Sequence, residues 1–143
     1  MLCLVAILVL VLLLPTAAQA KHRIPVPFQT MPFNNVTVTP GGSAEFLYTV
    51  ECPRSYGEEA DCTLVIVDRP GGRVVPVASV YLGVRPVVHF NACEWPASVC
   101  VSDTCRIDLK RGYYEWYVSA TMTVGGVPWT NTSFAMNPLY VEP

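Results

Sequence analysis

The chain has 143 residues and a formal net charge of −2, and 52% of its residues are hydrophobic. A length of this order is typical of one domain with a single hydrophobic core. No run of five or more basic residues occurs, so the composition gives no support for a phosphate-binding surface and we expect no nucleic-acid partner.

Residues 1–20 have the features of an export signal. Leu2 to Leu14 form an unbroken apolar run, Pro15 ends it, and the small residues of 16–20 suit signal peptidase. A run of about thirteen residues is too short to cross roughly 30 Å of hydrocarbon as a helix. No later stretch is long and apolar enough to do so, and the C-terminus is no lipid-anchor signal. We therefore expect a secreted, extracellular product without stable membrane insertion.

Residues 21–34 contain Pro25, Pro27 and Pro32 and show no hydrophobic periodicity. Proline-rich segments without a period are typical of extended, partly mobile arms. The sequence therefore predicts a proline-rich arm at 21–34 in front of a domain at 35–143.

Two sequons for N-linked glycosylation agree with export, Asn35-Val36-Thr37 and Asn131-Thr132-Ser133. We expect both asparagines on the surface with glycans attached. On this basis Val36 and Val38 point inward, and Trp129 shares the water-facing side of its strand with Asn131.

Residues after 35 follow the period of two that indicates β-strands. Ala44 to Cys52 and Tyr114 to Val124 alternate clearly, and Thr63 to Val67 is apolar on both faces, as in a central strand. Gly125-Gly126 predicts a hairpin turn, followed by a return strand from Val127 to Met136.

Residues 74–90 predict irregular or edge strands, because Pro76, Gly83 and Pro86 interrupt them. No stretch of the mature chain has the spacing of an amphipathic helix. About seven short antiparallel strands, forming a sandwich or a barrel, are therefore expected.

Two segments resemble immunoglobulin domains. "GGSAEFLYTV", Gly41 to Val50, is similar to their second strand, and "LKRGYYEW", Leu109 to Trp116, is similar to the corner before their sixth strand. The resemblance implies an antiparallel immunoglobulin-like sandwich, with Tyr114 as a corner tyrosine that bonds back to the backbone. Tyr48 and Trp116 stand where the family has its two cysteines, so an aromatic pair is expected in place of the inter-sheet disulfide.

Three other segments resemble secreted lipid-recognition proteins of the cholesterol-transfer and ganglioside-activator type. They are "VTVTPGGSAEF", "HFNAC" and "CRIDLKRGYY", although Arg106 stands where that family prefers proline. This second resemblance implies a sandwich whose sheets splay around a lipid, with Thr63 to Val67 lining the cavity.

Five cysteines remain after removal of the signal peptide, which is an odd number for an oxidising compartment. Their spacing does not match zinc or redox motifs, so we expect no metal. A bridge that closes the polar loop between Cys52 and Cys62 is the simplest pairing. Among the other three, Cys93 could pair with Cys105 or with Cys100, and the remaining thiol could be buried, capped or joined to a second chain.

No catalytic motif or cofactor fingerprint is present, so the sequence does not predict an enzyme. We expect a non-catalytic binding module for an extracellular or cell-surface protein. The alternatives are a lipid carrier and a disulfide-linked coat or matrix subunit. Aromatic residues in loops or on polar faces of strands mark a possible binding surface, unless they pack under loops. They are Tyr56, Trp95, Tyr113, Tyr117 and Trp129.

Overall fold

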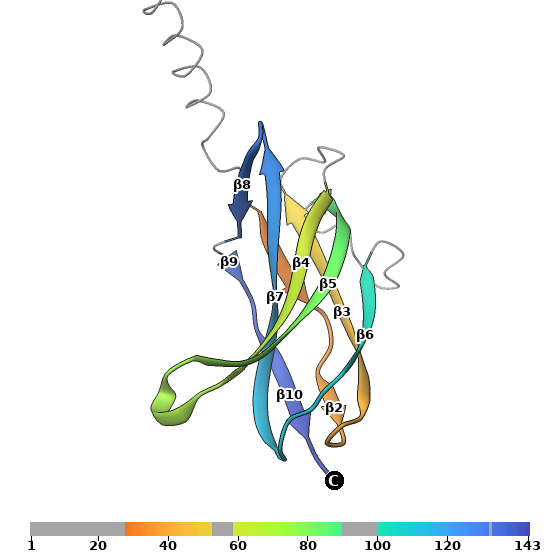
Figure 1. The fold of residues 1–143 in the computed structure, drawn as a ribbon, viewed down its shortest axis with the longest axis vertical. Helices are drawn as coiled ribbons and strands as arrows, with labels where there is room; N and C mark the ends of the chain where they lie inside the picture. Colours follow the sequence, from red (N-terminus) through yellow and green to blue (C-terminus); the bar gives the residue numbers. More distant parts are fainter. Residues whose placement is uncertain (1–27, 53–58, 90–99, 132) are drawn as a thin grey trace, which may run out of the picture.

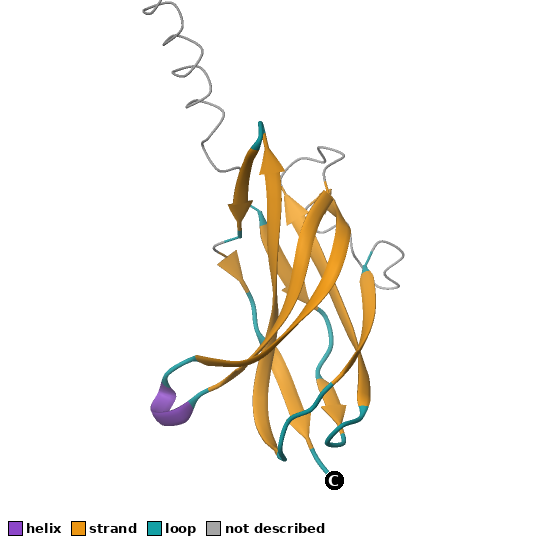
Figure 2. Cartoon of the chain, in the orientation of Figure 1, coloured by secondary structure: helices purple, strands orange, loops and turns teal. Residues whose placement is uncertain are grey.

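The computed structural model describes residues 28–52, 59–89, 100–131 and 133–143. Strands make up most of these ranges (Figure 2), which confirms the expected all-β class. None of the helical structure within them is long and apolar enough to cross a membrane. The predicted signal peptide, 1–20, lies outside the described residues.

The elements are β1 (Gln29–Pro32), β2 (Val36–Val38), β3 (Ser43–Cys52), β4 (Glu59–Asp68), η1 (Pro70–Gly72), β5 (Val75–His89), β6 (Val101–Arg106), β7 (Gly112–Val124), β8 (Val127–Thr130), β9 (Ser133–Phe134) and β10 (Asn137–Val141).

The strands join into one mixed sheet, whereas the sequence predicts about seven antiparallel strands. Their order is β2-β10-β7-β4-β5-β3-β1-β9, with β6 paired to β3 and β8 paired to β7. Three pairs are parallel, namely β1 with β9, β2 with β10 and β3 with β5. The sheet curls like half a barrel, so that β1, β3 and β6 face β4, β7 and β10 (Figure 1). Hydrophobic period alone does not encode the direction of a neighbouring strand, so the parallel pairs were not predicted.

The curl depends on β5, a strand of 15 residues. Most of β5 pairs with β4, but residues 87–89 pair with β3 in the other layer. The pairing with β4 shifts register near Gly83, whose φ of 100° suits glycine. Such a bulge bends a strand and lets β5 pass from one layer to the other. The breaks predicted at Pro76, Gly83 and Pro86 are therefore irregularities within one continuous strand.

Burial confirms the alternation predicted for β7 and for the first half of β3, whereas from Tyr48 to Cys52 β3 is buried on both faces, with Thr49 and Glu51 1% and 3% exposed. Inward side chains of both strands are at most 1% exposed, and β4 lies between β5 and β7 as the predicted central strand. The Gly125-Gly126 turn is also present, with φ values of 58° and 79°. The inward residues of the two strands are Phe46, Tyr48, Val50, Cys52, Trp116, Val118, Ala120 and Met122.

The aromatic contact at the centre of the core differs from the predicted one. Tyr48 and Trp116 are both fully buried, but the ring that meets Trp116 edge to face is Phe46, with centroids 5.0 Å apart. Phe46 occupies the inward position immediately before Tyr48 on β3. The Tyr48 hydroxyl donates a hydrogen bond of 2.6 Å to Asp103 Oδ2, and Arg85 of β5 also binds Asp103. A buried hydroxyl needs an acceptor, and Asp103 of β6 supplies it. Asp103 thereby joins Tyr48 of β3 to Arg85 of β5.

The predicted tyrosine corner is present before β7. The Tyr114 hydroxyl donates a hydrogen bond of 2.9 Å to the Lys110 carbonyl oxygen. Gly112 lies against the Tyr114 ring, and a Cβ atom at this position would come within 3.4 Å of Tyr114 Cε2. The small residue therefore lets the ring fold back over its own backbone.

The predicted arm is wrong for its last part. Gln29–Pro32 form β1, which pairs with β3, and Phe28 and Thr30 are 5% and 0% exposed. Proline is tolerated at Pro32 because β9 pairs only with Gln29 and Thr30, which leaves the other side of β1 as an open edge at Pro32. The domain therefore begins no later than Phe28, and residues 21–27 lie outside the described residues.

Candidate binding face

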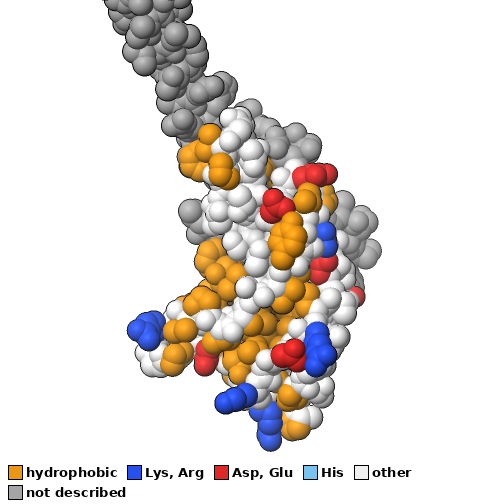
Figure 3. Space-filling model, in the orientation of Figure 1, with side chains coloured by type: hydrophobic (Ala, Val, Ile, Leu, Met, Phe, Trp, Pro, Cys, Tyr) orange, Lys and Arg blue, Asp and Glu red, His pale blue; other side chains and the backbone are white. Residues whose placement is uncertain are grey.

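The outer side of the layer formed by β5, β4, β7 and β10 carries a group of apolar side chains. They follow from alternation, because residues between the core positions of each strand point away from the core. We call this surface the aromatic face; Figure 3 shows hydrophobic side chains gathered over these strands, with charged side chains around them. Its members are Val65 of β4, Tyr81 of β5, Tyr113 and Tyr117 of β7, Phe134 of β9 and Tyr140 of β10.

Strand register brings these side chains together. Val65 lies opposite Tyr117, and Tyr113 lies opposite Tyr140. The Tyr117 and Phe134 rings are stacked with centroids 4.1 Å apart, and those of Tyr113 and Tyr140 are tilted with centroids 5.4 Å apart. Ring pairs that are ordered before binding lose less conformational entropy when a partner docks.

Four of the six members are exposed: Tyr81 is 64% exposed, Tyr113 52%, Phe134 38% and Tyr140 37%. Val65 and Tyr117 are half-buried. Exposed aromatic side chains that gather on one face are enriched at protein interaction sites.

Acidic groups on the aromatic face already have partners within the chain. Arg69 Nε contacts Glu115 Oε1, and the Tyr81 hydroxyl donates a hydrogen bond of 2.7 Å to Asp61 Oδ1. That hydrogen bond raises the pKa of the Tyr81 phenol, because the Asp61 carboxylate favours the protonated hydroxyl. The face therefore offers a partner tyrosine rings and few uncompensated charges.

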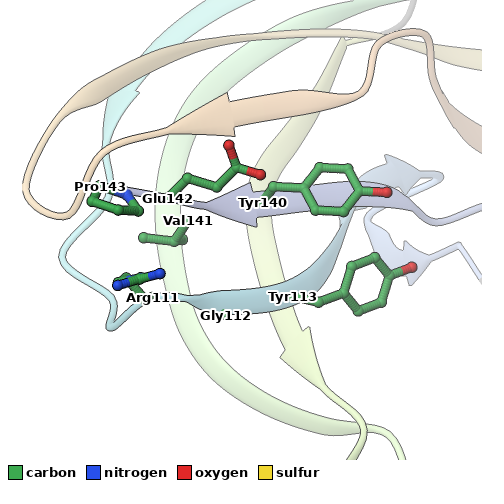
Figure 4. A pocket seen from close by; sticks show the side chains of 7 residues that line it. All are labelled: Arg111, Gly112, Tyr113, Tyr140, Val141, Glu142 and Pro143. Atoms are coloured by element: carbon green, nitrogen blue, oxygen red, sulfur yellow. The ribbon is translucent and has the colours of Figure 1, made fainter.

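An open hollow of about 390 Å³ lies at one end of the aromatic face. In Figure 4 the Tyr113 and Tyr140 rings lie side by side at one end of this hollow, away from Arg111 and Pro143. Arg111 and Glu142 add one charge of each sign to the lining.

The sequence identified part of this face. Tyr113 and Tyr117 belong to it, while Tyr56 and Trp95 lie outside the described residues. Trp129 is half-buried and packs against the core, so its assignment to a binding surface is wrong. Tyr81, Phe134 and Tyr140 were missed, although the position of Tyr81 between the apolar residues Val80 and Leu82 was a usable signal for the opposite face of the strand.

The two sequons differ in their surroundings. Asn35 is exposed, and Val36 and Val38 are 3% and 6% exposed, so the predicted side-chain directions there are confirmed. Asn131 is only 6% exposed. Its Nδ2 donates to Thr30 Oγ1 at 3.0 Å, and its Oδ1 accepts from the Ala120 N–H at 2.7 Å.

The expected glycan on Asn131 is therefore wrong for this fold, because the atom that would carry the sugar is a buried hydrogen-bond donor. The predicted sides of the return strand are also reversed, because Asn131 and Trp129 were expected to face water. Phe134 is exposed, whereas Asn131 and Trp129 face the core. The strand does not continue to Met136 but stops at Thr130 and resumes as β9.

The cysteines also depart from expectation. Cys62 and Cys105 are free thiols, which excludes the bridge between Cys52 and Cys62 and the pairing of Cys105 with Cys93. Cys100 is disulfide-bonded, and Cys93 lies outside the described residues. Cys62 and Cys105 are 0% and 7% exposed, so neither thiol is placed to join two chains.

We predict that native Cys62 resists alkylation. Burial raises its pKa to about 12, so at pH 8 roughly 10⁻⁴ of the thiol is thiolate, the reactive form. Iodoacetamide at pH 8 should leave Cys62 unmodified in the folded protein and label it fully in 6 M guanidinium, as read by peptide mass spectrometry. A Cys62→Ser variant identifies the peptide, and labelling of the folded chain at the rate of a free thiol would contradict the burial.

Among the described residues, no group of three or more His, Cys, Asp or Glu side chains is arranged to hold a metal ion. No protein-family model matches the chain, and no curated protein matches it in sequence.

Proposed function

We propose that the protein is a secreted, non-catalytic glycoprotein module with an immunoglobulin-like fold, which binds a protein outside the cell or on a cell surface. The observation that carries the proposal is the aromatic face, on which four rings form two ordered pairs. Tyrosine is enriched at the energetic centres of protein interfaces because its ring buries a large area with few rotatable bonds.

Strand pairing supports the immunoglobulin-like part of the proposal. The layer of β5, β4, β7 and β10 corresponds to the sheet that is extended by an extra strand in variable-type domains. The other layer, β1, β3 and β6, corresponds to part of the second sheet. The tyrosine corner before β7 agrees with this assignment.

A protein partner fits the face better than a lipid does. The inward residues of β4, Leu64 and Ile66, are 0% and 1% exposed and belong to one packed cluster with the fully buried Trp116. Among the described residues, the side chains between the two layers pack against one another, and none of the contacts favours a lipid there. The hydrophobic surface that remains is on the outside, where a second protein can cover it.

The test uses the secreted chain fused to an antibody constant region, which presents two copies. We expect it to bind intact cells of at least one type in a panel, to lose that binding after trypsin treatment of the cells, and not to bind phosphatidylcholine–phosphatidylserine vesicles. Tyr113→Arg should weaken binding by about tenfold or more, because it places a charge in the centre of the ring pair.

The matched control is Thr104→Arg, which adds the same charge to the exposed outer side of β6 in the other layer. It should bind like the unmodified chain. Equal binding by Tyr113→Arg, binding to vesicles, or no binding to any cell type would each count against the proposal.

A further inference from the structure

Phe33 is an exposed aromatic residue outside the aromatic face. It lies between β1 and β2 and is 45% exposed, although Pro32 before it is buried. A single exposed apolar side chain is ordinary on a protein surface, so what matters at Phe33 is which group lies beside it.

The sequon begins two residues after Phe33. Burial alternates along this segment, so that Phe33, Asn35 and Thr37 are exposed while Val36 and Val38 are buried. Residues 33–35 belong to no strand, but the alternation of burial continues through them. We therefore infer that the Phe33 and Asn35 side chains leave the chain on the same, outer side.

Hydrogen bonds hold this segment in place. The Phe33 N–H donates to the Leu47 carbonyl oxygen at 2.8 Å. The Asn34 side chain accepts from the Leu47 N–H at 2.9 Å and donates to the Glu45 carbonyl oxygen at 2.9 Å. Asn137 Nδ2 donates to the Asn34 carbonyl oxygen at 3.1 Å. With Asn34 fixed on both sides, Phe33 and Asn35 keep their outward directions.

We propose that Asn35 carries the N-linked glycan of this domain and that its first sugar, an N-acetylglucosamine, packs on the Phe33 ring. The apolar C–H face of a sugar ring suits the face of an aromatic ring, and covering Phe33 removes apolar area from water. The covalent bond holds the sugar at a high effective concentration near the ring, so even a weak attraction between them is enough to populate the contact. The glycan thereby becomes part of the folded structure.

The experiment compares thermal unfolding of the secreted protein before and after enzymatic removal of the glycan, in the unmodified chain and in Phe33→Ala. We expect removal to lower the Tm of the unmodified chain by about 3–6 °C, and to leave the Tm of Phe33→Ala nearly unchanged. Mass spectrometry of the same samples establishes that Asn35 is occupied in both.

Tyr140→Ala is the matched control, because Tyr140 lies opposite Thr37 and could receive the sugar instead. Its Tm should fall on deglycosylation as much as that of the unmodified chain. The proposal is overturned if Asn35 is unoccupied, if Phe33→Ala keeps the full Tm loss, or if Tyr140→Ala abolishes it. None of these results depends on whether the aromatic face binds a partner.

Discussion

Replacement of Trp116 by alanine should lower the free energy of unfolding by about 3–5 kcal/mol. Trp116 is 0% exposed, lies at the centre of the core, and packs edge to face against Phe46. It points from β7 into the opposite layer, where it meets Phe46 of β3, so the cavity would be walled by strands and could not be filled by moving one loop. Urea unfolding followed by circular dichroism measures the change.

Trp116→Phe is the informative control. The indole N–H of Trp116 has no hydrogen-bond acceptor among the described residues, so phenylalanine removes ring volume without breaking a hydrogen bond. We expect a loss of about 1–2 kcal/mol, well below that of the alanine variant. Equal losses of unfolding free energy for the two variants would contradict the conclusion that the packed volume of the ring provides the stabilisation.

The sequence predicted the strands whose side chains alternate between core and solvent. Phe46, Trp116 and their inward neighbours were identified because a sheet with one buried face imposes a period of two. The Gly125-Gly126 turn was predicted because its local chemistry is specific, and the Tyr114 corner was predicted because its segment resembles immunoglobulin domains. These features depend on residues close together in the chain.

Features that depend on distant residues were not predicted. β1 was assigned to an arm because prolines dominate its surroundings, yet Thr30 donates to the Val118 carbonyl oxygen, 88 positions away. Phe46 could not be distinguished from Tyr48 as the partner of Trp116, because both occupy inward positions of one strand. The hydroxyl of Tyr48 was the available signal, since its acceptor, Asp103, lies on another strand.

Only part of the aromatic face was predicted, because the side on which a residue lies can be assigned only along a regular strand. Tyr113 and Tyr117 lie on a regular strand, so their side could be assigned. Phe134 follows the interruption at Asn131, and a shift of one residue exchanges the two faces of a strand. The sequon at Asn131 predicts the outer side of the strand, although an asparagine amide can equally replace backbone hydrogen bonds inside a sheet.

Asn131→Ala should therefore destabilise the protein by about 2–4 kcal/mol, because it leaves the buried Ala120 N–H without the Asn131 side-chain acceptor and Thr30 without its donor. Asn35→Ala removes an exposed amide and, in protein made without glycosylation, should change stability by less than about 0.5 kcal/mol. Urea unfolding of both variants from bacterial expression measures the difference. Equal stability of the two would show that the Asn131 amide is not part of the packed interior.

Protein secreted from eukaryotic cells gives the second readout of the same prediction. Peptide mass spectrometry should find glycan at Asn35 and unmodified asparagine at Asn131, because a sugar on Asn131 Nδ2 would displace its bond to Thr30 and force the segment after β8 away from β1 and β7. Folded, secreted chains that carry glycan at Asn131 would contradict this packing, whatever the effect of Asn131→Ala on stability.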